Sequence, residues 1–241
     1  MELIAHRGLS ARAPENTLAA LRLALEERAD AVEWDVQASA DGIPVLLHDD
    51  TLDRTTDGSG RVDAHSLMEL RSLDAGSWFG ESYAGQPVPS LGEALALTAG
   101  RCDRIYPELK AGMSTSVVAR VVDEIGASGW ATDTVVLSLD WETLGHVRRL
   151  SDLRIGFVVE AVERYGRALS LAVEDGNAIV DPDRRILLEE PGLAKRAAGA
   201  GVELAAWTVN DAGEARRLLD MGVESLTTDD VAALRAGLER A

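Results

Sequence analysis

Short apolar runs alternate with amphipathic helical patterns eight times along this chain of 241 residues. Each run with its helix takes roughly 25 to 40 residues, which is typical of βα units in a parallel sheet. Eight such units fit a (β/α)₈ barrel, whereas a doubly wound sheet of this length would normally hold fewer. We therefore expect an α/β protein, with one TIM-barrel domain over residues 1–241.

The apolar runs and the helical patterns give a range for each expected element. The expected strands are Leu3 to His6, Ala31 to Gln37 with a short continuation over Pro44 to His48, Arg104 to Leu109, Thr134 to Leu139, Arg154 to Val159, Asn177 to Val180, Val202 to Val209 and Ser225 to Thr228. The expected helices are Asn16 to Arg28, Leu91 to Ala99, Ser114 to Ala127, Trp141 to Leu150, Arg164 to Val173, Leu187 to Gly199, Asp211 to Met221 and Val231 to Arg240. Capping residues agree with this pattern at the helix starts Asn16, Ser114 and Asp211.

Residues 50–90 interrupt the alternation after the second strand. This segment is rich in glycine and proline and contains one short helical pattern, around His65 to Arg71. Loops that follow barrel strands lie on the face where chemistry occurs. We therefore expect the insertion to form a wall of a substrate cleft rather than a plain surface excursion.

Charge and composition exclude several classes of function. The chain carries 24 basic and 41 acidic residues, and its net charge of −17 repels nucleic acid and anionic membrane surfaces. The single cysteine, Cys102, excludes an internal disulfide and a cysteine-rich zinc site. The sequence has neither a signal peptide pattern nor an apolar run of membrane-spanning length, so we expect no nucleic-acid partner, no membrane anchor and a cytoplasmic location.

Acidic residues gather on the second and third expected strands. Glu33 and Asp35 are two residues apart, so both side chains point to the same side of one strand. Two carboxylates on one side of a buried strand repel each other unless a cation lies between them. Glu108, near the end of the third strand, supplies a third carboxylate, and Lys110 follows it on the same side. Ligands that are all oxygen suit Mg²⁺ or Ca²⁺.

Two of the four histidines fall at the rim where these acids lie. His6 ends the first expected strand, and His48 ends the continuation of the second. A side chain that titrates near neutrality suits proton transfer at such a site. His65 and His146 lie in helical patterns, and we expect them at the surface.

A series of short motifs at successive strand ends resembles the glycerophosphodiester phosphodiesterase family. The matching residues, spread over residues 3–229, are His6-Arg7-Gly8, Pro14-Glu15-Asn16-Thr17, Glu33-Trp34-Asp35, His48-Asp49 with Leu52, Arg54-Thr55-Thr56 and Gly58 to Gly60, Glu108-Leu109-Lys110, Ser138-Leu139-Asp140, Trp207-Thr208-Val209-Asn210 and Thr228-Asp229. One three-residue match would be weak evidence. The number, order and placement of these matches argue against coincidence.

The resemblance implies a TIM barrel that hydrolyses a small-molecule glycerophosphodiester to sn-glycerol 3-phosphate and an alcohol such as choline, ethanolamine, inositol or glycerol. It implies a divalent metal ion, Mg²⁺ or Ca²⁺, with the ligands Glu33, Asp35 and Glu108. It also implies that His6 and His48 form the acid/base pair, without dividing the two roles between them. The nucleophile is either water or the substrate's own 2-hydroxyl, which would give a cyclic phosphate.

The resemblance further implies that Arg7 and Lys110 contact the phosphate and that Trp207 forms a wall of the glycerol or alcohol pocket. The chain departs from the family pattern at Leu139, where an aromatic residue is usual, and at Glu224 to Thr227, where Gly-Ile is usual. Both departures concern the shape of the pocket and of the last strand, and leave the implied metal ligands and histidines in place.

Several alternatives stay open at the level of sequence. Glu15 and Asp49 each have two interpretations, as a helix-stabilising charge or as a residue that orients a histidine. A lysophospholipase D-like activity on bulkier lipids would need an apolar groove, which Trp78, Phe79 and Tyr83 of the insertion could line. A noncatalytic binder of phosphate esters would keep the barrel but lack the acid/base pair. The oligomeric state is open.

Overall fold

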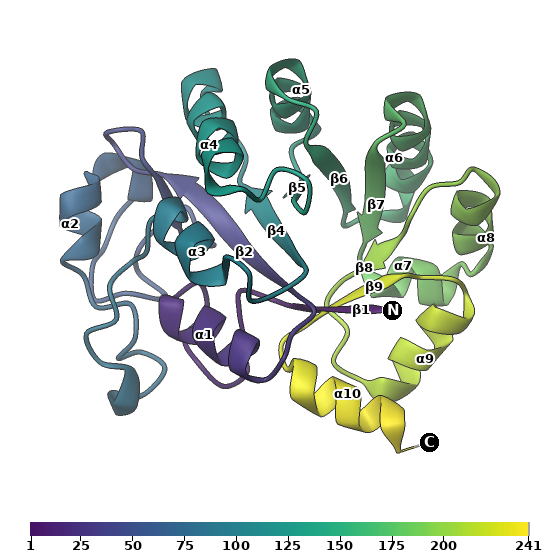
Figure 1. Cartoon of the computed structure of the whole chain (residues 1–241), viewed down its shortest axis with the longest axis horizontal. Coiled ribbons are helices and arrows are strands. Elements are labelled where there is room, and N and C mark those ends of the chain that lie inside the picture. Colours follow the sequence, from purple (N-terminus) through teal and green to yellow (C-terminus); the bar gives the residue numbers. More distant parts are fainter. Residues whose placement is uncertain (241) are drawn as a thin grey trace.

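A computed structural model describes residues 1–240 and shows a barrel of parallel strands surrounded by helices (Figure 1). The barrel strands are β1 (Glu2–Ala5), β2 (Ala31–Ala38), β4 (Arg104–Leu109), β5 (Val135–Ser138), β6 (Arg154–Val159), β7 (Ala178–Pro182), β8 (Ala205–Ala206) and β9 (Ser225–Thr228). They follow one another in the order β7-β6-β5-β4-β2-β1-β9-β8, and β7 meets β8 through the parallel bridges Val180–Leu204 and Asp183–Trp207. The nearly closed ring confirms the expected TIM-like α/β fold.

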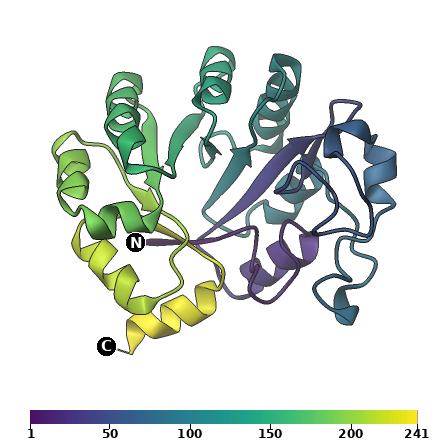
Figure 2. The same ribbon diagram turned by 180° about the vertical axis from the view of Figure 1, so that it is seen from behind.

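The helices lie outside this ring, and Figure 2 shows the same arrangement from behind. The α-helices are α1 (Leu18–Glu26), α2 (Leu67–Arg71), α3 (Leu91–Thr98), α4 (Thr115–Ser128), α5 (Trp141–Leu150), α6 (Val162–Asp175), α7 (Arg184–Glu189), α8 (Gly192–Gly199), α9 (Ala212–Asp220) and α10 (Val231–Glu239), and the short 3₁₀ helices are η1 (Val62–Ala64) and η2 (Glu81–Tyr83). Ser114 caps α4 and Asp211 caps α9, as predicted: each side chain accepts a backbone N–H of the first turn.

Apolar side chains fill the fold in two layers. The inner layer lies inside the ring of strands and consists of Ile4, Ala31, Tyr106, Val135, Leu137, Val158, Ile179 and Ala205. A larger cluster lies between the strands and the helices. Because alternate residues of each strand point to opposite layers, polar residues on the inner side near a strand's carboxyl end face the mouth of the barrel.

The expected continuation of the second strand over Pro44 to His48 is wrong. Residues Pro44–Leu46 form a separate strand, β3, which turns back and pairs antiparallel with β2, with Val36 opposite Leu46. The turn between them is closed by a hydrogen bond from Gly42 N–H to the Ser39 carbonyl, and Gly42 has a φ of 71°. The Asp41-Gly42 pair is a typical hairpin signal. This reversal carries His48 back toward the barrel.

Two expected helices also differ from the structure. The helix over Leu187 to Gly199 is instead α7 followed by α8, with Pro191 between them, because proline cannot supply the N–H that a continuous helix needs there. The helix expected to begin at Asn16 begins at Leu18, with Thr17 as its cap. The bounds of other elements shift by a few residues at their ends.

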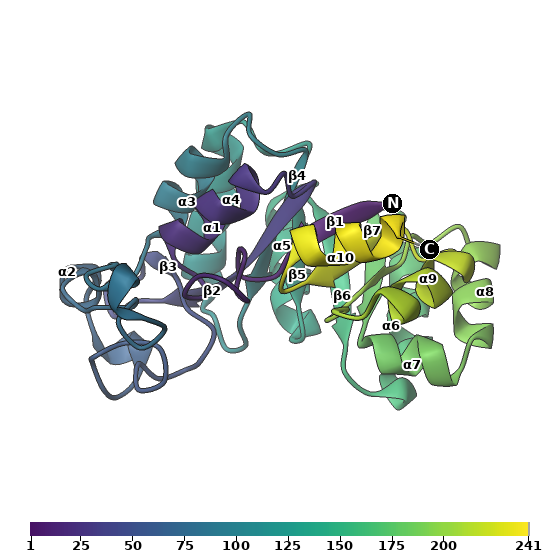
Figure 3. The same cartoon turned by 90° about the horizontal axis from the view of Figure 1, so that it is seen from below.

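The inserted segment has an apolar cluster of its own. Val45, Leu47, Leu52, Val62, Leu70, Ala75 and Val88 pack together. The helical pattern near His65 is confirmed as α2, capped by Ser66 and Glu69, while His65 itself lies between η1 and α2. Figure 3 shows α2 at one side of the molecule, apart from the helices around the barrel.

Candidate active site

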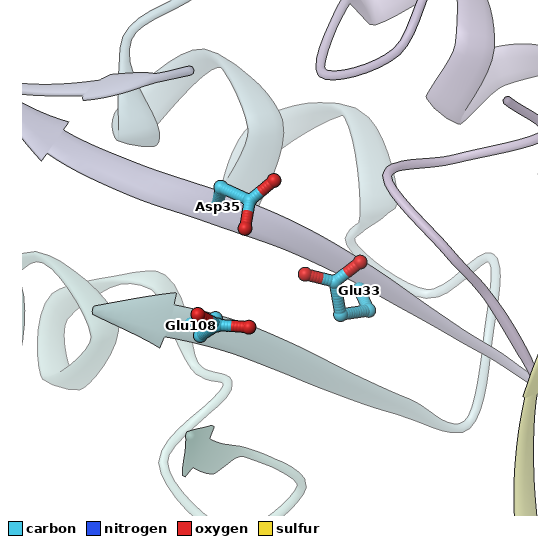
Figure 4. A group of neighbouring side chains, drawn as sticks. All are labelled: Glu33, Asp35 and Glu108. Carbon is cyan, nitrogen blue, oxygen red and sulfur yellow. The ribbon is translucent and has the colours of Figure 1, made fainter. Parts of the chain in front are cut away.

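Three carboxylates from two neighbouring strands meet at the mouth of the barrel. Glu33 and Asp35 lie on β2, Glu108 lies on β4, and Asp35 is directly opposite Glu108 in the parallel register. One oxygen of each lies within 4.8 Å of the others. Figure 4 shows the three side chains on the same side of the two strands. The structure thus brings together the three residues that the sequence proposed as metal ligands.

Burial makes the acids of β2 unfavourable unless cations balance their charge. Glu33 is 3% exposed and Asp35 is 1% exposed. Burial and the charges of Asp35 and Glu108 raise the pKa of Glu33 well above its ordinary value, and its Oε1 has no hydrogen-bond partner within residues 1–240. A divalent cation would supply both the missing partner and the missing charge. The donors are all oxygen, so the site fits a hard ion such as Mg²⁺ or Ca²⁺.

Two basic side chains border the acids. The backbone N–H of Arg7 donates to Glu33 at 2.7 Å, and its guanidinium lies 3.1 Å from Asp35. Lys110 Nζ lies 2.5 Å from Asp35 and 2.6 Å from Glu108. Burial alone would raise the pKa of Asp35, but the charges of Lys110 and Arg7 outweigh burial and lower it. Asp35 is therefore ionised, while Glu33 takes up a proton more readily.

Asn16 holds Asp35 in place from the loop before α1. Its side-chain amide donates to Asp35 Oδ2 at 2.7 Å, and its amide oxygen accepts the Asp35 backbone N–H at 2.9 Å. Asn16 has a φ of 58°, a conformation that asparagine tolerates better than most residues. This two-sided contact explains why Asn16 stands outside the helix that the sequence predicted to start there.

His6 follows β1 and faces a carboxylate from the opposite end of the chain. Its Nδ1 lies 2.6 Å from Asp229 Oδ1, just after β9. Asn210 and Ser10 also donate to Asp229, at 2.6 and 3.1 Å. Burial alone would raise the pKa of Asp229, but the hydrogen bonds from His6 and Asn210 outweigh it and lower the pKa to about 2. Asp229 is thus an ionised partner that orients the imidazole.

His48 has a similar partner in its neighbour, since Nδ1 lies 2.6 Å from Asp49 Oδ1. Arg54 of the insertion donates to Asp49 at 2.6 Å and to Glu15 at 2.8 Å, and Glu15 also accepts from Arg7 at 2.7 Å. Glu15 therefore joins two arginines and does not contact a histidine, while its role as a helix-stabilising charge stays a prediction. Asp49 takes the orienting position, and the hydrogen bond from Arg54 lowers its pKa to about 2.

One cavity connects these groups. Its walls are formed by His6, Arg7, Glu33, His48, Glu108, Lys110, Leu137, Leu139, Val158, Asp181, Trp207 and Thr227. Seven of the eight residues proposed from sequence are in this set, and the eighth, Asp35, lies behind them against Arg7 and Lys110. Leu139, at one of the departures from the family pattern, also faces the cavity, so that departure shapes the space beside the acids.

The model of the Glycerophosphoryl diester phosphodiesterase family matches residues 6–233 of the chain, which include every residue of the cavity. The chain belongs to this family. Among curated relatives of this phosphodiesterase family, the chain is 33% identical over 233 residues to the glycerophosphodiester phosphodiesterase of Caldanaerobacter subterraneus, covering 95% of this chain and 93% of the relative. It is 32% identical to the glycerophosphodiester phosphodiesterase of Bacillus subtilis, covering 94% and 82% of the two chains.

Solved structures of the phosphodiesterase family agree with this membership. A phosphodiesterase from Oleispira antarctica, in complex with the product sn-glycerol-3-phosphate, superposes with a TM-score of 0.92 and 31% identity, covering 99% of this chain and 97% of that one. A glycerophosphodiester phosphodiesterase from Agrobacterium tumefaciens gives a TM-score of 0.86 at 30% identity, covering 98% of this chain and 99% of that one.

Over residues 1–240, no helix has both the length and the apolar character needed to cross a bilayer.

Sequence reasoning missed four residues of the phosphodiesterase site. Asp229, Arg54 and Asn16 stand in the family motifs, yet their partners became visible only in space. Asp181 stands near the end of β7, and this place at the carboxyl end of a strand was the feature that could have identified it from sequence.

The aromatic residues of the insertion stay outside the cavity. Phe79 stacks edge to face with both Trp78 and Tyr83, with ring centres 5.6 Å apart in each pair, and none of the three belongs to the cavity walls.

Proposed function

We propose that the chain hydrolyses a glycerophosphodiester to sn-glycerol 3-phosphate and an alcohol, with a divalent metal ion held by Glu33, Asp35 and Glu108. Family membership makes the chain a glycerophosphodiester phosphodiesterase, a phosphoric diester hydrolase. The observation that carries the metal-dependent mechanism is the meeting of these three acids, two of them buried, with two carboxylate-paired histidines at one cavity. The product-bound relative supports the glycerol phosphate end of the substrate.

The bound ion would neutralise charge that builds up on the phosphate oxygens during attack. The chain's own cations serve the same end. The planar Arg7 guanidinium can donate two N–H groups to phosphate oxygens, and Lys110 adds a flexible ammonium group. Both side chains line the cavity, and their contacts with Asp35 fix their positions there.

The two histidines move protons on either side of the reaction. Asp229 and Asp49 accept a hydrogen bond from Nδ1 of His6 and His48, which leaves each Nε2 for the substrate. One histidine takes the proton of the attacking hydroxyl, from water or from the 2-hydroxyl of the glycerol. Attack by the 2-hydroxyl would give a cyclic phosphate, which a water molecule would then open to glycerol 3-phosphate. The other gives a proton to the departing alcohol oxygen as its bond to phosphorus breaks. The presence of both histidines argues against the alternative that the chain is a noncatalytic binder of phosphate esters.

The direct test is release of glycerol 3-phosphate from glycerophosphocholine with Mg²⁺ or Ca²⁺ added in parallel. We expect excess chelator to abolish turnover, because the three carboxylates lose the cation that they share. Adding the ion back should restore turnover. Glu108→Gln should lower turnover at least a hundredfold and keep the fold, whereas Glu174→Gln on the exposed side of α6 serves as the matched control. Full activity in chelator would overturn the metal role.

Comparing the short substrate with an acylated lysophospholipid tests the bulkier alternative. The insertion's aromatic residues do not line the cavity, so we expect the short substrate to be preferred. We further propose that residues 1–241 act as one catalytic domain in which Arg54 of the insertion contacts Asp49, the partner of His48, from outside the cavity. The cytoplasmic location stays a prediction from the sequence.

A further inference from the structure

Asp181 is a buried carboxyl group that the reaction described above does not use. It lies on β7, two residues after the inner-layer residue Ile179, so its side chain points to the same inner side. Only 3% of the residue is exposed, and Oδ1 has no hydrogen-bond partner within residues 1–240. A buried carboxyl oxygen without a partner is unfavourable because it has lost its hydrogen bonds to water, so a group from outside the chain is needed to satisfy it.

The surroundings of Asp181 show where that group would come from. Asp181 lines the cavity that contains the acids and the histidines. Its direct neighbour on β6 is Val158, and the indole N–H of Trp207 donates to its backbone carbonyl at 3.0 Å. Leu137 and Leu139 line the same space. Asp181 is therefore a polar group among apolar walls, which is the arrangement that orients a small ligand with both carbon atoms and hydroxyls.

Charge separates this part of the cavity from the phosphate-binding part. The cations that face the cavity, Arg7 and Lys110, contact the acids of β2 and β4. Asp181 has no ion-pair partner among the described residues, so a phosphate placed against it would meet a carboxyl group without a compensating cation. Burial, together with the charge of Glu108, raises the pKa of Asp181 well above its ordinary value. A neutral carboxyl group both donates and accepts, as an alcohol hydroxyl does.

We propose that Asp181 is a specificity-determining residue that hydrogen-bonds a hydroxyl of the substrate's glycerol moiety, while Trp207 and the neighbouring apolar side chains contact its carbon atoms. This assignment rests on the proposed function and adds the residue that distinguishes glycerol phosphate from other phosphate esters. The competing interpretation is that the Asp181 carboxyl group binds the ammonium head group of the substrate, which would require Asp181 to be ionised.

Binding of sn-glycerol 3-phosphate and of inorganic phosphate separates these interpretations. We would measure both by calorimetry, in the presence of Mg²⁺ or Ca²⁺, for the wild type, Asp181→Asn and Asp181→Leu. We expect Asp181→Leu to weaken glycerol 3-phosphate roughly 10–100-fold more than phosphate, because one buried hydrogen bond is lost. Asp181→Asn, which keeps a neutral donor and acceptor, should stay within about threefold of the wild type.

Steady-state kinetics give the second measurement. With glycerophosphocholine, Asp181→Leu should raise KM more than it lowers kcat, since the lost contact lies away from the phosphate. Equal weakening of both ligands would overturn the proposal in favour of a structural role. An unchanged affinity for glycerol 3-phosphate in Asp181→Leu would overturn it in favour of a buried water. A KM for glycerophosphocholine that rises in Asp181→Asn as much as in Asp181→Leu, with the glycerol 3-phosphate affinity of both variants unchanged, would overturn it in favour of the ammonium contact.

The same experiments distinguish a failure of this assignment from a failure of the proposed function. Loss of the preference for glycerol 3-phosphate in Asp181→Leu would support Asp181 even if the wild type did not hydrolyse glycerophosphocholine, and the catalytic proposal alone would then be wrong. A wild type that hydrolyses glycerophosphocholine while Asp181→Leu keeps the full preference would instead refute the role of Asp181 alone.

Discussion

At the scale of single residues, both histidines are held by a carboxylate, but the two carboxylates reach them by different routes. Asp49 is the next residue after His48, whereas Asp229 comes from a strand more than 200 residues from His6. The first contact is local, and the second exists because β1 pairs in parallel with β9. The orientation of the His6 ring therefore depends on the pairing of the first and last strands.

Asp229→Asn tests this contact through its dependence on pH. An acid whose pKa is lower in the folded state stabilises the fold above its unfolded pKa of about 3.9, and this contribution is lost as the pH falls through the folded pKa. The pKa of Asp229 in the fold is about 2. The side chain is 34% exposed, so we expect the variant to lose about 1 kcal/mol of unfolding free energy at pH 6, after discounting for solvent screening.

Urea denaturation of the metal-free protein at pH 6, 4.5 and 3 measures this difference. We expect the gap between wild type and Asp229→Asn to be constant from pH 6 to 4.5 and to narrow below pH 4, because the wild-type carboxylate then loses its advantage over the unfolded state. A gap that stays the same at pH 3 would mean that the asparagine costs stability for a reason other than the lost charge.

Residue identity and strand alternation were enough to predict the acids and the histidines, but not their partners. Glu33 and Asp35 could be placed on one side of a strand because the side-chain period of a strand is two. The contact of Asn16 with Asp35 depends on a positive φ, which no periodicity encodes. Asp181 is one acid among many in an acidic chain, and only its burial without a partner distinguishes it.

At the scale of elements, the hairpin of β2 and β3 decides where His48 lies. A continued β2 would carry His48 away from the barrel, but the antiparallel return brings the chain back until Leu47 N–H donates to the Asp35 carbonyl. Arg54 of the insertion then ties the region after β3 to the loop before α1 through Asp49 and Glu15. The expected strand had the right residues in the wrong direction, since an apolar run does not show which way its strand runs.

Arg54→Gln tests whether the insertion supports catalysis from outside the cavity. Without the guanidinium, Asp49 and Glu15 lose their shared donor, and the orientation of His48 loosens. We expect kcat/KM for glycerophosphocholine to fall roughly 10–100-fold, the range seen when such supporting contacts are removed. Arg61→Gln is the matched control, because Arg61 lies in the same insertion and pairs at the surface with Asp63. Full activity of Arg54→Gln would refute the supporting role.

Gly8 sets the distance between β1 and α1. Its φ is 79°, and a Cβ built there would lie 2.5 Å from the Ala20 backbone. We expect Gly8→Ala to cost about 2–4 kcal/mol of unfolding free energy, from strained φ and from displacement of α1. Gly100→Ala is the matched control, because Gly100 has a φ of 68° and nothing within 4 Å of the added Cβ. Thermal unfolding of both variants measures the cost of the steric contact as the difference between their losses of unfolding free energy. Equal losses in Gly8→Ala and Gly100→Ala would show that the contact with Ala20 costs nothing.

At the scale of the whole molecule, both ends of the barrel are polar, for different reasons. The carboxyl ends of the strands carry the buried acids, whose charges are partly unpaired. At the opposite end, Tyr106 donates to Glu2 at 2.5 Å and Ser225 donates to the same carboxylate at 3.0 Å, which satisfies the polar groups there. The alternation of strands and helices predicted the barrel as a whole because every unit repeats the pattern. The closure between β7 and β8 depends on two short bridges that the sequence does not reveal.

This asymmetry predicts opposite effects of substitution at the two ends. Tyr106→Phe removes a satisfied buried hydrogen bond, so it should lower the unfolding free energy by about 1–2 kcal/mol while kcat stays at the wild-type value. Glu33→Gln removes a buried carboxyl group whose ionised form is disfavoured by burial and by the charges of Asp35 and Glu108, so the metal-free variant should be at least as stable as the wild type, although its turnover is lost. Added Mg²⁺ or Ca²⁺ should then raise the unfolding midpoint of the wild type and of Tyr106→Phe, but not that of Glu33→Gln, because only a state that binds the ion gains stability from it. Thermal unfolding with and without the ion gives all the comparisons, and a Glu33→Gln variant that is both less stable and stabilised by the ion would contradict the placement of the metal between these acids.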